Sequence, residues 1–471
     1  MHDLDAREVA AGVRTGDLKA RDVLEACLDR IEERNPALNA FVFVDAARAR
    51  SVADAVDAAV EAGRDPGPLA GVPLGVKELE EVEGWPHTLA STVWADRLGT
   101  RTSIMTSRLL AAGCVPVGLT ASPEIGHLFY TTSVLHGPTR NPWDLDRTPG
   151  GSSGGAGAAL AAGLVPLCTG SDMGGSIRLP AGWSGVVGVK GTLGRIPRGP
   201  GYLGSANLIH YGPLARSVGD AARFLDVTAG VDPRDPTSLP APAEAFESAM
   251  VTTDLGGLRI GVVDDLGLCP SHPEVAACLH DAVPPLAAAI GGTATDVVLE
   301  IPEIATGAAA QLVVDRDPSL GDAMNDVMVN LFATPGAAPL FEYAYASLAL
   351  DLDALAGLVQ MRHELNERIA ALFERVDVIA LPTAPVPAFG CEGPIPTEVA
   401  GRDVGPAAPA LFTSPFNLSG HPVVSVPMGV VDGCPVGMQL VTRRHDDALV
   451  VALAAAFERA RPWPKLAPGA D

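Results

Sequence analysis

Serine residues lie among glycines in two short stretches of the chain, at 150–157 and at 170–178. Glycine costs backbone entropy, so this density indicates a main chain that adopts positive φ or comes close to a ligand. A serine held where backbone N–H groups converge can attack a carbonyl carbon while those groups bind the carbonyl oxygen. The two stretches therefore predict the core of a serine hydrolase.

The second stretch can supply both the attacking group and an oxyanion site. Its residues Asp172-Met-Gly-Gly-Ser-Ile-Arg178 can turn successive N–H groups toward one small concavity, which is what a developing oxyanion requires. Ser176 is then the predicted nucleophile. The expected oxyanion donors are the backbone N–H groups of Met173, Gly174, Gly175 and Ser176.

The nucleophile needs a proton acceptor, and no histidine lies near it in the sequence. Lys77 ends an apolar run, 69–76, that is typical of a buried strand, although a lysine at a strand end is more often a surface salt bridge. If burial lowers its pKa enough to leave it neutral, Lys77 is a candidate base. Ser152 of the first stretch can relay the proton between Ser176 and Lys77.

Three other interpretations of local motifs are weaker. The run Gly151-Ser-Ser-Gly-Gly155 matches G-x-S-x-G and would make Ser153 the nucleophile of an α/β-hydrolase, but no later histidine has a distinctive setting. A dinucleotide-binding loop would need a third glycine where Leu160 stands. The run His363-Glu-Leu-Asn-Glu367 lacks the last histidine of a zinc-binding helix. We expect neither a metal nor an organic cofactor.

Motifs spread along the chain resemble those of the amidase signature hydrolases. They are Gly71-Val-Pro-Leu-Gly-Val-Lys77, Gly137-Pro-Thr-Arg-Asn-Pro-Trp143, Gly150-Gly-Ser-Ser-Gly-Gly155, Asp172-Met-Gly-Gly-Ser-Ile-Arg-Leu-Pro180, Gly185-Val-Val-Gly-Val-Lys190, Asn417-Leu-Ser-Gly-His-Pro422 and Gly433-Cys-Pro-Val-Gly-Met-Gln-Leu440. The resemblance covers nearly the whole chain, and its central motif is long and specific. It implies an amidohydrolase that cleaves linear amides through an acyl-enzyme.

The resemblance implies a Ser–Ser–Lys triad. By position in the motifs, Lys77 is the general base, Ser152 is the bridging serine and Ser176 is the nucleophile. The bridging serine of this family follows a cis peptide bond, which here is the bond between Gly151 and Ser152. An oxyanion hole made by the backbone of the second stretch completes the implied site.

Residues beside the triad are expected to support it. Ser153 and Asp172 are expected to position the catalytic loops by hydrogen bonds, and Arg178 to form a structural ion pair. Met173 stands where the family commonly has threonine or another small residue, so the wall of the pocket is expected to differ there.

Three segments are the best candidates for choosing the substrate, namely Ile125–Val134, Pro197–Tyr211 and the helical region at about 305–370. No cluster of arginine or lysine lies near them, so a neutral or aromatic acyl or amine group is favoured. An aryl amide, an ester or a carbamate (urethane) is the leading substrate class. The side chains expected to contact it are Phe129, Tyr130, Thr131 and Tyr202.

Two other classes of function remain open. One is the glutaminase-type A subunit of a tRNA-dependent amidotransferase, which shares the triad but works inside a complex. The run at 202–211 lacks the usual sequence of that protein. The other is a non-catalytic binding protein on the same scaffold, and the intact Lys77, Ser152 and Ser176 argue against it.

Charge and composition exclude several kinds of partner. The 471-residue chain has a formal net charge of −23 and no basic stretch, which argues against nucleic acid and anionic membranes as partners. We find neither a signal peptide nor an apolar run of membrane-spanning length, and the seven scattered cysteines indicate a reducing compartment. A cytoplasmic protein, either a monomer or a homodimer, is expected.

The order of elements predicts one large α/β/α sandwich, in which helices cover both faces of a mixed, twisted central sheet. Within this single domain we expect an N-terminal helical layer at 1–65, a catalytic core at 66–200 and a helical substrate-side region at about 305–370. Asn35-Pro36 is expected to end a helix, and Asp296–Leu299 to form a strand.

Overall fold

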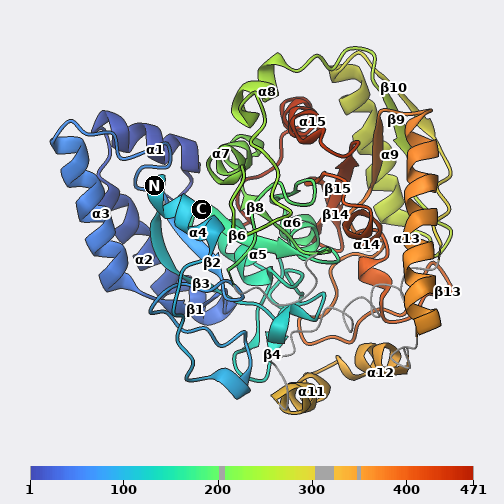
Figure 1. Cartoon of the computed structure of the whole chain (residues 1–471), viewed down its shortest axis with the longest axis horizontal. Coiled ribbons are helices and arrows are strands. Elements are labelled where there is room, and N and C mark those ends of the chain that lie inside the picture. The colour runs from blue at the N-terminus through green and yellow to red at the C-terminus, as the bar shows by residue number, and fades with distance from the viewer. Residues whose placement is uncertain (1, 201–206, 303–322, 347–351, 470–471) are drawn as a thin grey trace.

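The computed structural model describes residues 2–200, 207–302, 323–346 and 352–469. A mixed β-sheet of eleven described strands runs through the centre of the molecule (Figure 1). Its strands, in chain order, are β1 (Phe41–Val44), β2 (Pro73–Lys77), β3 (Val115–Thr120), β6 (Leu167–Asp172), β7 (Val187–Lys190), β8 (His210–Ala215), β9 (Arg259–Val262), β10 (Thr293–Asp296), β11 (Val378–Pro382), β14 (Val423–Val431) and β15 (Cys434–Val441).

Across the sheet these strands lie in the order β1-β3-β2-β6-β8-β7-β14-β15-β11-β9-β10. The pairs β3–β2, β2–β6, β11–β9 and β9–β10 are parallel, and the remaining neighbours are antiparallel. Two small hairpins lie outside the sheet, one of β4 (Thr132–Ser133) with β5 (Gly137–Pro138) and one of β12 (Glu398–Val399) with β13 (Arg402–Asp403).

Helices flank the sheet, and the predicted α/β fold with a mixed central sheet is confirmed. One series of helices contacts its neighbours in turn, and α5 and α6 contact each other and the central strands. The series consists of α1 (Ala6–Thr15), α2 (Ala20–Leu38), α3 (Ala46–Glu61), α7 (Val218–Thr228), α8 (Phe246–Thr252), α9 (Pro273–Ala289) and α15 (Asp447–Ala460), and the pair is α5 (Gly154–Ala161) and α6 (Arg178–Ser184).

The remaining helices lie along the lower and right-hand sides of the molecule or between strands (Figure 1). They are α4 (Ile104–Ala111), α11 (Ala323–Ala333), α12 (Ala338–Ala346), α13 (Leu352–Phe373), α14 (Ser414–Leu418) and the short 3₁₀ turns η1 (Thr92–Trp94), η2 (Glu124–Gly126) and η4 (Ala408–Ala410). The described parts of the expected substrate-side region are α11, α12 and α13, and 303–322 and 347–351 lie outside the described residues.

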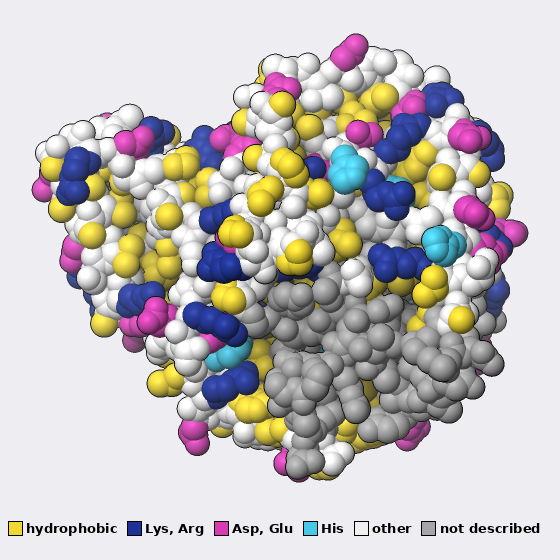
Figure 2. All heavy atoms as spheres, viewed as in Figure 1, with side chains coloured by type: hydrophobic (Ala, Val, Ile, Leu, Met, Phe, Trp, Pro, Cys, Tyr) yellow, Lys and Arg dark blue, Asp and Glu magenta, His cyan; other side chains and the backbone are white. Residues whose placement is uncertain are grey.

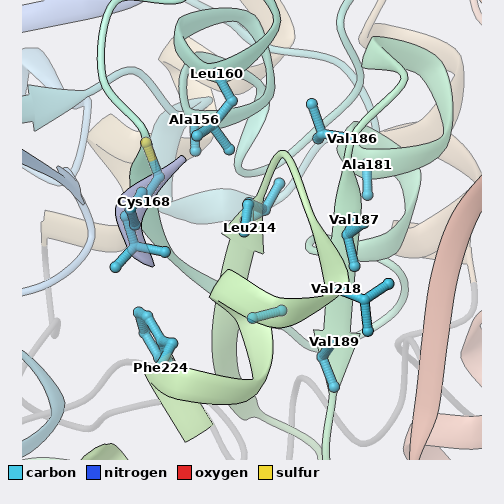
Figure 3. Close-up of a cluster of buried hydrophobic side chains, with 14 of the residues drawn as sticks. Ala156, Leu160, Cys168, Ala181, Val186, Val187, Val189, Leu214, Val218 and Phe224 are labelled. Atoms are coloured by element: carbon cyan, nitrogen blue, oxygen red, sulfur yellow. The ribbon is translucent and has the colours of Figure 1, made fainter. Parts of the chain in front are cut away.

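The core forms where α5, α6 and α7 meet the centre of the sheet (Figure 3). Leu160 of α5, Ala181 of α6, Leu214 of β8 and Phe224 of α7 belong to this cluster, and each of them is fully buried. Strand β8 was not predicted, and its first two residues, His210 and Tyr211, fall in the segment that we interpreted as a substrate loop. The strand is buried in the centre of the sheet, where it pairs with β6 on one side and with β7 on the other.

Two predicted boundaries are wrong. Helix α2 continues through Pro36 to Leu38 and ends at Asn39, whose φ is 51°. A proline in the last turn removes only one N–H and is therefore tolerated there. Strand β10 ends at Asp296 instead of beginning there, and its four residues are exposed at the sheet edge, so no apolar period marks them.

The acidic and basic side chains of the surface are interspersed on the face shown in Figure 2, with apolar side chains between them. The C-terminal tail lies against the N-terminal segment, where Lys465 pairs with Asp5 at 2.6 Å and the Ala467 N–H donates to the Ala161 carbonyl. Both ends of the described chain are thus attached to the same side of the core (Figure 1).

Candidate active site

Lys77 is the last residue of β2, between the parallel strands β3 and β6. Its side chain is fully buried. Its backbone N–H donates to the hydroxyl of Thr169 on β6 at 2.9 Å, which fixes the end of the strand. Its Nζ lies 2.8 Å from Ser152 Oγ, 3.0 Å from Ser171 Oγ and 3.3 Å from the Ser171 carbonyl oxygen. The amine is therefore surrounded by hydroxyls and a carbonyl.

Burial lowers the pKa of Lys77 to about 7, against the opposing negative charges of Glu80 and Asp172. The cause is desolvation, because a buried ammonium loses its hydration and the neutral amine does not. Near neutral pH about half of the molecules therefore carry an amine that can accept a proton. The geometry places that amine on the hydroxyl of Ser152.

The loop that carries Ser152 connects to the start of α5. Ser152 is buried, and the Gly151–Ser152 peptide bond is cis, as the family resemblance implies. The hydroxyl of Thr131 donates to the Gly150 carbonyl at 2.9 Å and accepts from the Gly154 N–H at 3.2 Å. One side chain thus holds both ends of the serine loop.

The glycines of α5 serve close packing of backbone on backbone. A β-carbon at Gly155 would lie 2.2 Å from the backbone nitrogen of Ala121, at the end of β3. The helix can therefore approach the strand ends only with glycine at this position. This approach brings Ser152 under the end of β2, so most of the glycine density in the first stretch reflects protein packing and not contact with a ligand.

Ser176 lies in the turn between β6 and α6 and is half-buried. Its carbonyl accepts the N–H of Ser153 at 3.2 Å, which joins the two glycine-rich stretches. Gly175 has a φ of 126°, and a β-carbon there would lie 2.5 Å from the hydroxyl of Thr413. Only glycine fits this turn, in which Ser176 is half-buried and joined by its carbonyl to the loop that carries Ser152 and Ser153.

The four N–H groups expected to bind the oxyanion differ in whether they already donate to a protein acceptor. The N–H of Gly175 donates to the carboxylate of Asp172 at 2.8 Å, so in this structure it is engaged within the loop. The hydroxyl of Thr413 donates to the Gly174 carbonyl at 2.5 Å and fixes that peptide unit. The remaining candidates for the oxyanion are the N–H groups of Met173, Gly174 and Ser176.

Asp172 and Arg178 form an ion pair beneath the nucleophile turn. Both are fully buried, and the guanidinium donates to both carboxylate oxygens at 2.9 Å. Arg178 also donates to Asn417 Oδ1 at 2.5 Å and to Gln439 Oε1 at 2.7 Å. Burial alone would raise the pKa of Asp172, but the charge and hydrogen bonds of Arg178 hold it below its usual range.

Asn417 and Gln439 were not singled out from the sequence as site residues. Asn417 donates to the Asp172 carbonyl at 2.9 Å and to its carboxylate at 2.8 Å, and Gln439 donates to the carbonyls of Pro382 and Phe412. Both belong to the last two motifs that carry the family resemblance. Those motifs therefore complete the network around Arg178, and their presence was the signal that could have identified both residues.

The expected substrate contacts divide into three groups. Phe129 is half-buried and stays a candidate. Tyr130 is fully buried, donates to the Pro335 carbonyl and packs edge-on against Phe389, and Thr131 holds the serine loop. We therefore correct the expectation for Tyr130 and Thr131, because protein atoms already occupy their polar groups. Tyr202 lies outside the described residues.

Ser153 is fully buried, and its hydroxyl makes no hydrogen bond within the described structure. The hydrogen bond by which Ser153 joins the two loops comes from its backbone N–H, which donates to the Ser176 carbonyl. Among the described residues, no group of three or more His, Cys, Asp and Glu side chains is arranged to hold a metal ion. No helix in the described ranges is both long and apolar enough to cross a membrane.

Comparison with known proteins assigns the chain that carries these motifs to a family. The model of the family described as Amidase matches residues 22–451. An acylamidase of Rhodococcus erythropolis is 33% identical over 98% of this chain and 96% of its own length. The A subunit of the glutamyl-tRNA(Gln) amidotransferase of Acidothermus cellulolyticus is 36% identical over 98% of this chain and 95% of its own.

Solved structures agree with the sequence relatives. A bacterial aryl acylamidase of the amidase signature enzymes superposes with a TM-score of 0.89 and 31% identity, covering 98% of this chain and 96% of that one. A 6-aminohexanoate cyclic dimer hydrolase in complex with its substrate superposes with a TM-score of 0.86 and 30% identity, covering 99% of each chain.

Proposed function

This chain belongs to the amidase signature family of hydrolases that act on carbon–nitrogen bonds, and on that premise we propose that it cleaves neutral or aryl amides with a Ser–Ser–Lys triad. The observation that carries the proposal is the 2.8 Å contact between the fully buried amine of Lys77 and the hydroxyl of Ser152. Burial without a contacting carboxylate favours the neutral amine, which is the form that can accept a proton from a neighbouring hydroxyl.

The proposed mechanism uses these residues in two steps. Neutral Lys77 takes the proton of Ser152 as Ser152 takes the proton of Ser176, whose Oγ attacks the carbonyl carbon of the substrate. The backbone N–H groups of Met173, Gly174 and Ser176 hold the oxyanion. The proton returns to the nitrogen, the C–N bond breaks, and the amine leaves from an acyl-enzyme. Water then attacks the ester of Ser176 by the same relay, which releases the acid.

The apolar character of the partly exposed side chains near Ser176 supports a neutral acyl group. Phe129 and Met173 are both half-buried and pack on the hydrophobic cluster beneath the site. The named activity of the acylamidase relatives is consistent with such a substrate. Esters and carbamates share the carbonyl geometry and are proposed as further substrates.

The decisive experiment removes the nucleophile. Ser176→Ala is expected to abolish turnover of an acyl anilide and labelling by a fluorophosphonate, because no other group forms the acyl-enzyme. Mass spectrometry should locate the label of the wild-type protein at residue 176. Ser107→Ala, at an exposed serine of α4, is the control and should leave both unchanged. Turnover by Ser176→Ala at the wild-type rate would refute the triad.

A second candidate function follows from the amidotransferase relatives, which match this chain as well as the acylamidase does. In that case the protein would release ammonia from glutamine as one component of a larger complex. Purified protein that hydrolyses glutamine only with its partners present, and leaves acyl anilides intact, would favour it. Turnover of anilides by the isolated chain favours the amidase.

A further inference from the structure

Three residues other than glycine have left-handed backbone conformations beside the Lys77–Ser152 pair. They are Leu89 at φ 54°, Ala90 at φ 58° and Ile125 at φ 45°. For a β-branched residue such as isoleucine this conformation is a genuine outlier. The Ile125 N–H donates to the Leu89 carbonyl at 2.8 Å, so the two strained loops hold one another. Strain of this kind persists only where the surroundings impose it, and it gathers at functional sites.

Two buried glutamates hold these loops. Glu78, which follows Lys77, accepts from the hydroxyl of Thr88 at 2.6 Å and from the Ala90 N–H at 3.2 Å. Glu124 accepts from the hydroxyl of Ser91 at 2.5 Å. Both carboxylates are about 1% exposed, so these contacts are shielded from water. Each end of the loop at 88–91 is therefore bound to a different carboxylate.

Glu124 also connects the loops to the substrate-side helices. Its Oε1 accepts from Asn330 Nδ2 of α11 at 3.0 Å. Helix α11 contacts both η1 and η2, and its buried Val327 and Leu331 belong to the same hydrophobic cluster as Ile125. The carboxylate of Glu124 is thus a buried polar link between α11 and the catalytic side of the molecule, beside the exposed hydrogen bond from Asn330 to Thr92.

The strained segment ends against the relay serine. A β-carbon at Gly126 would lie 3.4 Å from Ser152 Oγ and 2.8 Å from the side chain of Leu79. A β-carbon at Gly151 would lie 2.6 Å from the backbone nitrogen of Tyr130. The backbone at 126–130 is therefore the wall against which Ser152 is held. We expect a movement of this wall to change the position of the Ser152 hydroxyl relative to Lys77 and to let water approach the amine.

We propose that Glu124 is a positioning residue of the hydrolase, which ties α11 to the loop at 88–91 and thereby holds the segment 124–126 against Ser152. The inference rests on the proposed function, because it requires Ser152 to relay a proton. It extends that function by making the efficiency of the relay depend on the packing of a substrate-side helix. Glu124 itself touches neither the triad nor the reacting atoms.

The test compares two substitutions of Glu124 with a control. Glu124→Ala is expected to lower kcat for an acyl anilide about 10- to 100-fold, with KM changed less than about 3-fold, because a misplaced relay slows chemistry more than binding. Glu124→Gln keeps an oxygen that accepts from Ser91 and Asn330, and should stay within about 3-fold of wild type. Thr92→Val removes the other hydrogen bond of Asn330, at 2.8 Å, and should leave kcat unchanged.

The pH profile separates positioning from a merely structural role. Water that reaches Lys77 raises its pKa toward the ordinary value, so the acid limb of kcat in Glu124→Ala should move to higher pH. The charged groups that act on Lys77 in this site are Glu80 and Asp172, and neither is changed in these variants. Melting temperatures show that each variant is folded. Asn330→Leu, at a half-buried position, replaces Glu124→Ala if that variant does not fold, and should lower kcat about 3- to 10-fold.

The outcomes are distinguishable. A folded Glu124→Ala, or a folded Asn330→Leu in its place, that keeps wild-type kcat and acid limb overturns the positioning role and leaves the amidase function intact. A loss that Glu124→Gln does not restore, with an unmoved acid limb, overturns it as well. Wild-type protein that neither hydrolyses amides nor reacts with a fluorophosphonate refutes the proposed function itself.

Discussion

Lys77 and Arg178 are two fully buried cationic side chains of one site, and they differ in what surrounds the charge. Lys77 contacts hydroxyls and a carbonyl, and its pKa falls to about 7. Arg178 contacts both oxygens of Asp172 and keeps that acid ionised. Burial without a contacting carboxylate thus favours the neutral form of Lys77, and the contacting carboxylate of Asp172 keeps Arg178 in a fixed ion pair.

The residue types suit these two tasks. An arginine stays protonated in proteins and presents a rigid fork of donors, which matches the carboxylate of Asp172 and the amide oxygens of Asn417 and Gln439. A lysine changes its pKa readily when buried. The predictions below test this division, beginning with the largest expected effect.

Replacement of the base should have the largest effect. Lys77→Met is expected to lower kcat at least about 10³-fold, because no other group can accept the relay proton. Lys77→Arg should be equally inactive, since a guanidinium keeps its proton at every working pH. Steady-state kinetics with melting curves measure both effects. A kcat of Lys77→Arg within tenfold of wild type would contradict the assignment of Lys77 as base.

Removal of the carboxylate of Asp172 should destabilise the fold, because it leaves the charge of Arg178 unpaired. Asp172→Asn leaves Arg178 buried without its carboxylate, and is expected to reduce the free energy of unfolding by about 3–5 kcal/mol. Urea denaturation measures the change. Asp54→Asn removes an exposed partner of Arg21 and is the matched control, with an unchanged midpoint expected. Equal stability of the two variants would show that the buried pair is not needed.

The pH dependence of activity reports the state of Lys77 directly. The protonated amine cannot accept a proton, so activity should be half-maximal at about pH 7, reach its plateau at higher pH and fall about tenfold for each pH unit well below 7. The slope of log(kcat/KM) against pH measures this. A profile that stays flat to pH 5 would show that the base has an ordinary carboxylate pKa and is not Lys77.

Desolvation should also shift the pKa of a buried acid outside the site. Burial raises the pKa of Glu458 to about 7, although the N–H of Val218 favours its ionised form. The folded state prefers the neutral acid, so its stability should fall as pH rises from about 4.5 to about 7. Glu458→Gln keeps the acceptor and should gain about 1–3 kcal/mol at pH 8 and nothing at pH 4. Equal urea midpoints at pH 8 would contradict the shift.

Much of the fold could be predicted because apolar runs of strand length are local signals. The buried strand with Lys77 at its end was predicted from the apolar run that precedes the lysine. The exposed edge strand β10 and the central strand β8 were not predicted correctly, since neither carries a distinctive local pattern. The side chains of Tyr130 and Thr131 were assigned to the substrate because their residue types suit a pocket as well as a core.

The sequence alone determined the residues that can do the chemistry. A lysine after an apolar strand and serines among glycines are local patterns, and their order along the chain is that of a known family. The sequence also determined that Arg178 would be close to Asp172, because only the short segment 173–177 separates the two residues.

The tertiary structure decided the protonation state and the hydrogen-bond partners of those residues. The pKa of Lys77 depends on burial by strands and loops that are distant in sequence, and Arg178 finds Asn417 and Gln439 more than 200 residues away. The contact of Glu124 with Asn330 likewise spans 206 residues. Desolvation and hydrogen bonding act through space, so the sequence could name Lys77 as a candidate base but could not show the burial that lowers its pKa or the contacts that hold the Ser152 loop.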